Sequence, residues 1–222
     1  MKVFLLQRKR LTALACALAA AAMFYVVNYP AAVSAYATDR QLPIYCVQRD
    51  QKMLSISFDA AWGNEDTQQL IDILGKYNVK ATFFVVGSWV DKYPESVKAL
   101  HDAGHEVMNH SNDHAHMSQL SKEEIIADVE ACNDKIEAVT GVRPTLIRPP
   151  YGEYDNNVIT AIRSIGMEPI QWDVDSLDWK DLSAADITQR VVSKVQPGSI
   201  VLFHNAALHT PEALPGILET LI

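Results

Sequence analysis

The stretch Leu-Ser-Ile-Ser-Phe-Asp at residues 54–59 alternates small polar and large apolar side chains and ends in a carboxylate. This alternation predicts a β-strand. Five further runs of this kind follow along the chain, at residues 81–86, 106–109, 145–147, 169–172 and 200–203. Stretches of helical period separate them, at residues 66–77, 94–103, 122–139, 156–165, 184–195 and 212–222. Six strand–helix units predict an α/β fold with parallel strands and crossover helices.

Local signals mark where several of these helices begin and end. Ser121 followed by Glu124 is a capping-box pattern at the start of the helix expected at residues 122–139. Glycines stand just past three expected helix ends, at Gly104, Gly141 and Gly166. Glycine is favoured there because it adopts the left-handed conformation that ends many helices.

The composition is that of a globular protein, with 222 residues of which 49% are hydrophobic and 21% are charged. Lys and Arg number 19 against 27 Asp and Glu, for a formal net charge of −8. Residues 1–37 carry four of the basic side chains and none of the acidic ones, so the remainder has a net charge of −12. An acidic chain without a basic stripe predicts no nucleic-acid partner.

The first 37 residues differ from the rest of the chain. Four basic residues up to Arg10 precede the apolar run 11–27, and Ala-Tyr-Ala at residues 35–37 resembles a cleavage site. This pattern predicts an export signal, and the run is also at the short limit for a membrane-spanning helix. Residues 1–37 are therefore expected to be a cleaved signal peptide or an N-terminal membrane anchor. In both cases the linker at 38–52 and the domain at 53–222 lie outside the cytoplasm.

Chemically capable side chains follow five of the expected strands. They are Asp59, the segments 110–114, 148–152 and 173–179, and His204 with Asn205. In a parallel α/β fold, ligands bind at the carboxyl ends of the strands. A rim that served stability alone would tolerate many residue types, so this convergence favours a functional site.

Two histidines in the second of these segments have the spacing of metal ligands. His110 and His114 stand at i and i+4, which places them on one face if the segment is helical. Imidazole suits zinc, iron, cobalt or nickel better than calcium or magnesium. The alternative is a pair of surface histidines in a His-rich loop, because His101, His105 and His116 lie nearby.

Three further residues are candidates for proton transfer. Asp59 at its strand end can accept a proton from an activated water, although an aspartate there can also form a turn. Arg148 can hold that carboxylate ionised and oriented, or form a plain structural ion pair. His204 is a second proton-transfer candidate, with a structural role as the alternative.

Five short motifs carry a resemblance to a known family. They are Ser-Phe-Asp (57–59), His-Ser-Asn-Asp-His (110–114), Arg-Pro-Pro-Tyr-Gly (148–152), Asp-Ser-Leu-Asp-Trp (175–179) and Leu-Phe-His (202–204). In order and approximate spacing, residues 53–222 resemble the polysaccharide deacetylase family, or NodB-homology domain. The leader, residues 42–47 and the stretch Phe-Asp-Ala-Ala-Trp-Gly at 58–63 resemble its membrane-linked, sporulation-type branch.

The resemblance implies a distorted (β/α) barrel and metal-dependent hydrolysis of an N-acetyl, sometimes O-acetyl, group on a sugar polymer. It implies that Asp59 is the general base, His204 the general acid, and His110 and His114 two metal ligands. The resemblance also implies that Arg148 orients the base and that Asp175 or Asp178 adjusts the pKa of the acid. The remaining matches are implied to contact the substrate. The backbone N–H of Tyr151 would bind the oxyanion, Trp179 would form a wall of the substrate groove and Leu202 would line the pocket for the acetyl group.

The sequence departs from the family pattern at one position of the first motif. The family has two adjacent aspartates there, the second being the third metal ligand, whereas this chain has Ala60. Asp66, Glu65, a water or Asp59 itself are the possible replacements. With two histidines alone, metal affinity should be weaker and protons should compete as pH falls. The family also usually adds a strand after the last helix, so the barrel is expected to be a fragment or a shortened variant lacking it.

The sequence therefore predicts an N-deacetylase that uses zinc, cobalt or nickel on an extracytoplasmic amino-sugar polymer, peptidoglycan or a chitin-like oligosaccharide. Ala60 leaves open a catalytically weak or inactive glycan-binding relative. The expected partners are an N-acetylated glycan and, if the leader is uncleaved, the membrane. Trp62, Trp89 and Trp179 either stack on sugar rings or belong to the core.

Overall fold

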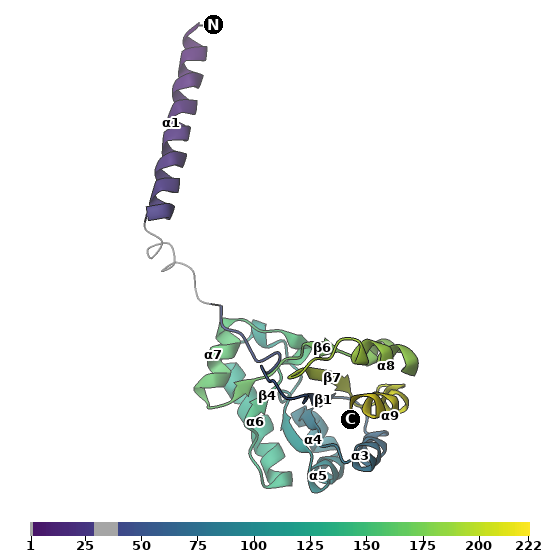
Figure 1. The fold of residues 1–222 in the computed structure, drawn as a ribbon. Coiled ribbons are helices and arrows are strands. Elements are labelled where there is room, and N and C mark those ends of the chain that lie inside the picture. The colour runs from purple at the N-terminus through teal and green to yellow at the C-terminus, as the bar shows by residue number, and fades with distance from the viewer. Residues whose placement is uncertain (1, 29–39) are drawn as a thin grey trace. The chain divides into compact units, whose positions relative to one another are not determined.

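The structure is a computed structural model that describes residues 2–28 and 40–222 (Figure 1). The chain divides into two compact units, Met1–Arg40 and Gln41–Ile222. The described part of the first unit holds helix α1 (Lys2–Asn28). Within the described residues, none of the helices has the length and apolar character that crossing a membrane requires. The expected cleavage site at 35–37 lies outside the described residues.

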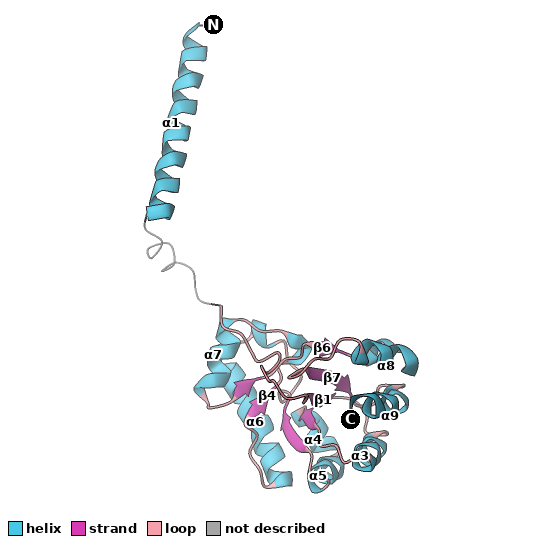
Figure 2. Cartoon of the chain, in the orientation of Figure 1, coloured by secondary structure: helices cyan, strands magenta, loops and turns pink. Residues whose placement is uncertain are grey.

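The second unit is built, in its described residues, on a sheet of seven parallel strands. These are β1 (Ser55–Ala60), β2 (Thr82–Val85), β3 (Glu106–Asn109), β4 (Leu146–Ile147), β5 (Glu168–Pro169), β6 (Val174–Asp175) and β7 (Ile200–His204). The strand order is β5-β4-β3-β2-β1-β7-β6, so β1 lies at the centre, between β2 and β7. Figure 2 shows the curled sheet with helices outside it, a half-barrel that confirms the expected α/β fold of the distorted-barrel type.

Helices connect the strands. They are α3 (Thr67–Lys76), α4 (Gly87–Lys92), α5 (Pro94–Asp102), α6 (Lys122–Thr140), α7 (Asn156–Ser164), α8 (Ala184–Val192) and α9 (Thr210–Leu221), with 3-10 turns η1 (Met117–Gln119), η2 (Pro150–Gly152) and η3 (Asp178–Lys180). The expected helices are present, and the capping box of Ser121 with Glu124 is confirmed. Helix α4 was not expected, because six residues are too few to show a helical period. The single strand expected at 169–172 is wrong: β5 ends at Pro169, and β6 begins at Val174.

The two faces of β1 have different roles. Phe58 and Ala60 belong to the main apolar core, where the Phe58 ring stacks on Phe83 and Phe203 at centroid distances of 4.8 and 5.5 Å. Helices α3, α5 and α9 pack over this side of the sheet. Since side chains alternate along a strand, Ser57 and Asp59 point to the opposite, inner side. The period of the strand thus directs Asp59 toward the interior of the barrel.

Part of the segment expected as a linker, 38–52, is hydrogen-bonded to the barrel. Ile44 donates its N–H to Pro169 O at 2.9 Å, and Val47 donates to Gly198 O at 2.9 Å. Gly198 has φ +89°, and a Cβ there would overlap the carbonyl oxygen of Val47. A glycine is needed at this position because both the backbone angle and the close approach exclude a side chain.

Replacing Gly198 tests this contact between Val47 and the start of β7. We expect Gly198→Ala to lower the free energy of unfolding by at least about 1–2 kcal/mol, because alanine is strained at positive φ and its Cβ would displace Val47. Gly75→Ala is the matched control: Gly75 lies in α3 with open space around its Cβ position, so alanine should be neutral or stabilise by up to about 1 kcal/mol. Urea unfolding measures both, and equal effects would contradict the constraint.

Candidate active site

The five motifs meet at one cavity of about 470 Å³ at the carboxyl ends of the strands. Its lining contains residues from each motif: Asp59, His110, His114, Tyr151, Asp175, Trp179, Leu202 and His204. Two other expected site residues, Arg148 and Asp178, lie fully buried and hydrogen-bond to lining residues. The fold therefore brings together every expected site residue except Asp66.

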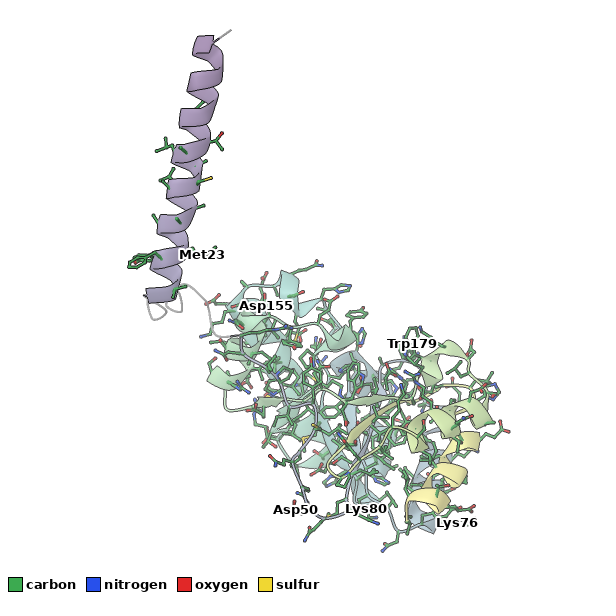
Figure 3. The ribbon with its side chains drawn as sticks, turned by 45° about the horizontal axis from the view of Figure 1, so that its top comes forward. Met23, Asp50, Lys76, Lys80, Asp155 and Trp179 are labelled. Carbon is green, nitrogen blue, oxygen red and sulfur yellow. The ribbon has the colours of Figure 1, made fainter. Side chains whose placement is uncertain are left out.

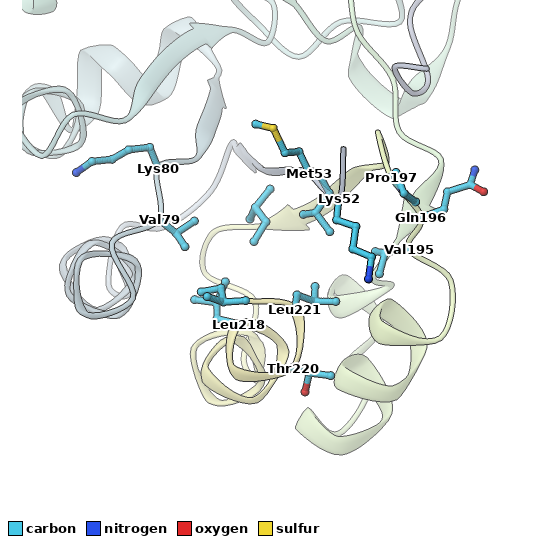
Figure 4. A pocket seen from close by; sticks show the side chains of 13 residues that line it. Lys52, Met53, Val79, Lys80, Val195, Gln196, Pro197, Leu218, Thr220 and Leu221 are labelled. Carbon is cyan, nitrogen blue, oxygen red and sulfur yellow. The ribbon is translucent and has the colours of Figure 1, made fainter. Parts of the chain in front are cut away.

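A larger cavity of about 580 Å³ lies at the amino ends of β1, β2 and β7 (Figure 4). Its lining is mostly aliphatic, with Lys52 and Lys80 as its charged members among the described residues. In Figure 3, Trp179 of the smaller cavity and Lys80 of the larger one lie on opposite sides of the domain. Only the smaller lining, within the described residues, combines carboxylates with imidazoles, so chemistry and not size identifies the candidate site.

Arg148 holds Asp59 in a buried ion pair. Its Nη1 donates to Asp59 Oδ1 at 2.7 Å. Its Nη2 donates to Ser57 Oγ at 2.8 Å and to Gln171 O at 3.2 Å. The guanidinium lies over the Phe84 ring, 4.2 Å from the centroid. These contacts fix the orientation of the carboxylate, because the planar guanidinium has one position that satisfies all of them.

The charges around Asp59 keep it ionised. Burial by itself would raise the pKa of this carboxyl, but the charge and hydrogen bond of Arg148, with the charge of His204, outweigh burial and bring the pKa below its ordinary value. The free oxygen, Oδ2, lies 3.5 Å from His110 Nε2. Asp59 is thus an ionised carboxylate with one oxygen clamped and the other facing the cavity, as a general base requires.

His204 lies on the neighbouring strand β7, in register with Asp59, and is held by Asp178. His204 Nδ1 donates to Asp178 Oδ1 at 2.8 Å, and the other carboxylate oxygen accepts from His204 N and from Thr210 Oγ1. Burial would lower the pKa of His204, but the hydrogen bond and charge of Asp178, with the charges of Asp59 and Asp175, raise it above the ordinary value. His204 is therefore suited to carry a proton near neutral pH and to donate it from Nε2.

The structure distinguishes the two aspartates that the sequence left as alternatives. Asp178 contacts the His204 ring directly, whereas Asp175 accepts from Leu177 N at 2.8 Å and lines the cavity. Asp175 acts on His204 through its charge alone. The geometry therefore favours Asp178 as the carboxylate that tunes this histidine.

The histidine pair lies on a loop, so the helical placement considered from the i, i+4 spacing is wrong. His110 and His114 follow β3, and their ring centroids are 5.0 Å apart. Ser111 and His114 have positive φ, 71° and 54°, which turns the chain back on itself. Asp128 of α6 accepts from Asn112 N at 2.9 Å and so holds the turn. The spacing of His110 and His114 carried no signal for the contact of Asn112 with Asp128, because these two residues are 16 positions apart.

Both rings are suited to remain neutral. Burial lowers the pKa of His110, and burial lowers the pKa of His114 to about 4. His110 Nδ1 donates to Arg148 O at 2.6 Å, which leaves Nε2 without a proton and facing the cavity. Neutral imidazole is the form that binds a metal.

A metal site built on His110 and His114 lacks a third donor. Asp66, the expected replacement, accepts from Ala206 N at 2.9 Å at the start of α3, and Ala60 is packed in the apolar core. The described residues contain no group of three His, Cys, Asp or Glu side chains arranged to hold an ion. Catalytic transition-metal sites generally use three protein ligands, so these residues do not fit such a site.

Tyr151 presents a backbone donor to the cavity. It has φ 60° within η2, and its N–H has no acceptor among the described residues. Its ring lies between His114 and His116, at centroid distances of 4.5 and 4.2 Å, and stacks flat on His116. His116 is held in turn by Glu153 Oε2 at 3.0 Å from Nδ1. The sequence pattern marks His116 only as a neighbour of the histidine pair and carries no signal for Glu153, because the stacking depends on the left-handed turn at Tyr151.

Replacing Asp178 tests the pKa of His204 without any assay of activity. We expect Asp178→Asn to lower the pKa of His204, because the neutral amide cannot stabilise the imidazolium. In the parent protein the ring should lose its proton above the ordinary histidine range, and in the variant at lower pH. An NMR titration of the His204 ring proton measures both. Glu212→Gln, beside His209, is the control and should leave His204 unchanged. An equal midpoint in Asp178→Asn would contradict the assignment.

Comparison with known proteins agrees with this geometry. A family model described as polysaccharide deacetylase matches residues 47–170. The peptidoglycan-N-acetylmuramic acid deacetylase PdaC of Bacillus subtilis is 36% identical over 175 residues, which cover 79% of this chain and 37% of that protein. The peptidoglycan-N-acetylglucosamine deacetylase of Bacillus cereus is 34% identical over 152 residues, which cover 68% of this chain and 55% of that protein.

Solved structures share the fold. The crystal structure of wild-type BA3943, described as a CE4 family pseudoenzyme from Bacillus anthracis, matches with a TM-score of 0.78 and 38% identity, over 81% of this chain and 64% of that chain. A BA3943 mutant described as having restored enzymatic activity matches with a TM-score of 0.78 and 39% identity, over 81% of this chain and 66% of that chain. The chain thus spans less than two thirds of the length of each of these proteins.

Proposed function

The chain belongs to the polysaccharide deacetylase family, and from this premise we propose that it hydrolyses N-acetyl groups of an amino-sugar polymer. The observation that carries the proposal is that two side chains of one cavity have pKa values shifted in opposite directions. Arg148 lowers the pKa of Asp59, and Asp178 raises the pKa of His204. A base and an acid kept apart in this way suit acid–base chemistry on a neutral substrate. Two relatives named as peptidoglycan deacetylases favour peptidoglycan as the polymer, with a chitin-like oligosaccharide as the alternative.

Asp59 and His204 are suited to the two chemical difficulties of amide hydrolysis. The carbonyl is a poor electrophile and the amine is a poor leaving group, so catalysis must act on both. In our proposal Asp59 removes a proton from a water as its oxygen bonds to the carbonyl carbon. His204 then gives its proton to the sugar nitrogen as the C–N bond breaks. Acetic acid and the free amino sugar leave. The acid then loses its proton to solvent, and the proton held by Asp59 returns through solvent to His204, so that both groups regain their starting forms.

Other residues act by position. The free N–H of Tyr151 is suited to stabilise, by a hydrogen bond, the negative charge that develops on the carbonyl oxygen. A fixed donor needs no reorganisation during the reaction. Leu202 lines the cavity with only 2% of its surface exposed and suits the acetyl methyl group. Arg148 keeps Asp59 from rotating away from the water. No step is assigned to a metal, because the donor set lacks its third ligand.

A second candidate function is glycan binding with little or no turnover. Ala60 favours it, because the family pattern has an aspartate at this position as the third metal ligand and alanine has no donor atom. The likeness to a structure described as a pseudoenzyme favours it as well. Hydrolysis stays the leading proposal because binding alone needs neither an ionised Asp59 nor a protonated His204.

Acetate release from peptidoglycan and from N-acetylglucosamine oligomers tests hydrolysis. Metal-stripped protein is compared with protein given zinc, cobalt or nickel. We expect release by the parent, and a loss of about 100-fold or more in Asp59→Asn, because a positioned general base contributes at least that factor. Val142→Ala, an exposed residue outside the cavity lining, is the control. Bound glycan without acetate release under any of these conditions would establish the second candidate instead.

We further propose that residues 1–37 export the domain, so that it acts outside the cytoplasm, where peptidoglycan lies. The support is the basic start, the apolar run and the small residues described above. Fusing residues 1–40 to alkaline phosphatase, which is active only after export, should give an active reporter in bacteria. N-terminal sequencing of the exported product separates a cleaved signal peptide from a retained anchor. An inactive reporter made at normal level would contradict export.

A further inference from the structure

Trp62 is an exposed aromatic side chain at the cavity that the proposed reaction does not use. Three large aromatic side chains of the cavity lining are more than half exposed: Trp62 at 57%, Tyr151 at 56% and Trp179 at 53%. Trp89, considered with them in the sequence, is 2% exposed and belongs to the core. Leaving an indole in contact with water forgoes the stabilisation that burial would give, so its exposure beside a cavity suggests a ligand.

The Trp62 ring lies close to two histidines of the candidate active site. Its centroid is 6.3 Å from that of His114 and 6.0 Å from that of His204. The rings are tilted by 55° and 40°, so neither imidazole stacks flat on the indole. A ligand group lying on Trp62 would therefore lie next to both His114 and the proton donor His204.

Hydrogen bonds hold the loop that carries Trp62. The carbonyl of the next residue, Gly63, accepts from Trp89 Nε1 at 3.0 Å and from Asn205 Nδ2. Asn64 Nδ2 donates to Ser96 Oγ at 3.0 Å. Asp66, which ends the loop, accepts from Ala206 N just beyond β7. These bonds tie the loop to α4, α5 and the end of β7, which limits the freedom that ligand binding would otherwise have to remove.

We propose that Trp62 is the stacking platform for a pyranose ring of the glycan, adjacent to the reacting acetamide. A pyranose with equatorial substituents presents a face of C–H groups, which packs on an aromatic ring while its hydroxyls stay in water. This assignment rests on the proposed function for the identity of the ligand. It also gives Asp66 a role other than metal ligation, as a positioning residue that holds the Trp62 loop against the strand end carrying His204.

Glycan affinity of Trp62 variants tests the platform. The probe is a β-1,4-linked N-acetylglucosamine tetrasaccharide, and binding is measured by calorimetry in an Asp59→Asn background, which prevents turnover. We expect Trp62→Ala to weaken binding about three- to tenfold, and Trp62→Phe to keep most of the affinity because it keeps an aromatic face. Val142→Ala should bind like the background protein. Thermal unfolding should be unchanged in all three variants, because Trp62 is exposed.

The kinetic readout separates this inference from the proposed function. In a protein that releases acetate, Trp62→Ala should raise KM more than it lowers kcat, as expected when binding to substrate and transition state is lost equally. Acetate release with unchanged tetrasaccharide affinity in Trp62→Ala would overturn the platform alone. Tetrasaccharide binding that depends on Trp62, without acetate release, would support the stacking platform and contradict the proposed hydrolysis. Absence of both binding and release in the parent would overturn both.

Discussion

The buried pair of Arg148 and Asp59 is the interaction on which the site depends. One guanidinium reaches Asp59 and Ser57 of β1, the Gln171 carbonyl beyond β5 and the Phe84 ring of β2. Removing two such charges from water is costly, and the cost is offset only where the geometry satisfies both partners. The pair therefore needs the sheet to be curled as it is, and it leaves one oxygen of Asp59 directed into the cavity.

The electrostatics of the cavity follow from this pair and from a second one, Asp178 with His204 of the neighbouring strand β7. Arg148 stabilises the negative form of Asp59, and Asp178 stabilises the positive form of His204. Burial works against both charged forms, so each would lose its charge without its partner. Two buried residues outside the cavity lining, Arg148 and Asp178, thus determine the protonation of two that belong to it.

The missing third metal donor results from the residue at position 60. Asp59 lines the cavity, whereas its neighbour Ala60 has only a methyl group, which packs in the apolar core with Phe58. Asp66, considered with Glu65 as a substitute, is hydrogen-bonded at the start of α3 to the chain beyond β7. The cavity thus contains carboxylates and imidazoles, but no group of three such side chains arranged to hold an ion among the described residues.

The sequence by itself determined the α/β class, most helix and strand limits and the members of the site, because strand period, helix caps and motif spacing are local properties. It did not determine β6, α4 or the loop of His110 and His114, which are short and depend on contacts such as that of Asp128 with Asn112. Only the tertiary structure distinguished Asp178 from Asp175, showed Asp66 bonded to Ala206 N and showed the Trp62 ring near His114 and His204. Those assignments depend on distances between segments far apart in the chain, and a sequence pattern carries no measure of such distances.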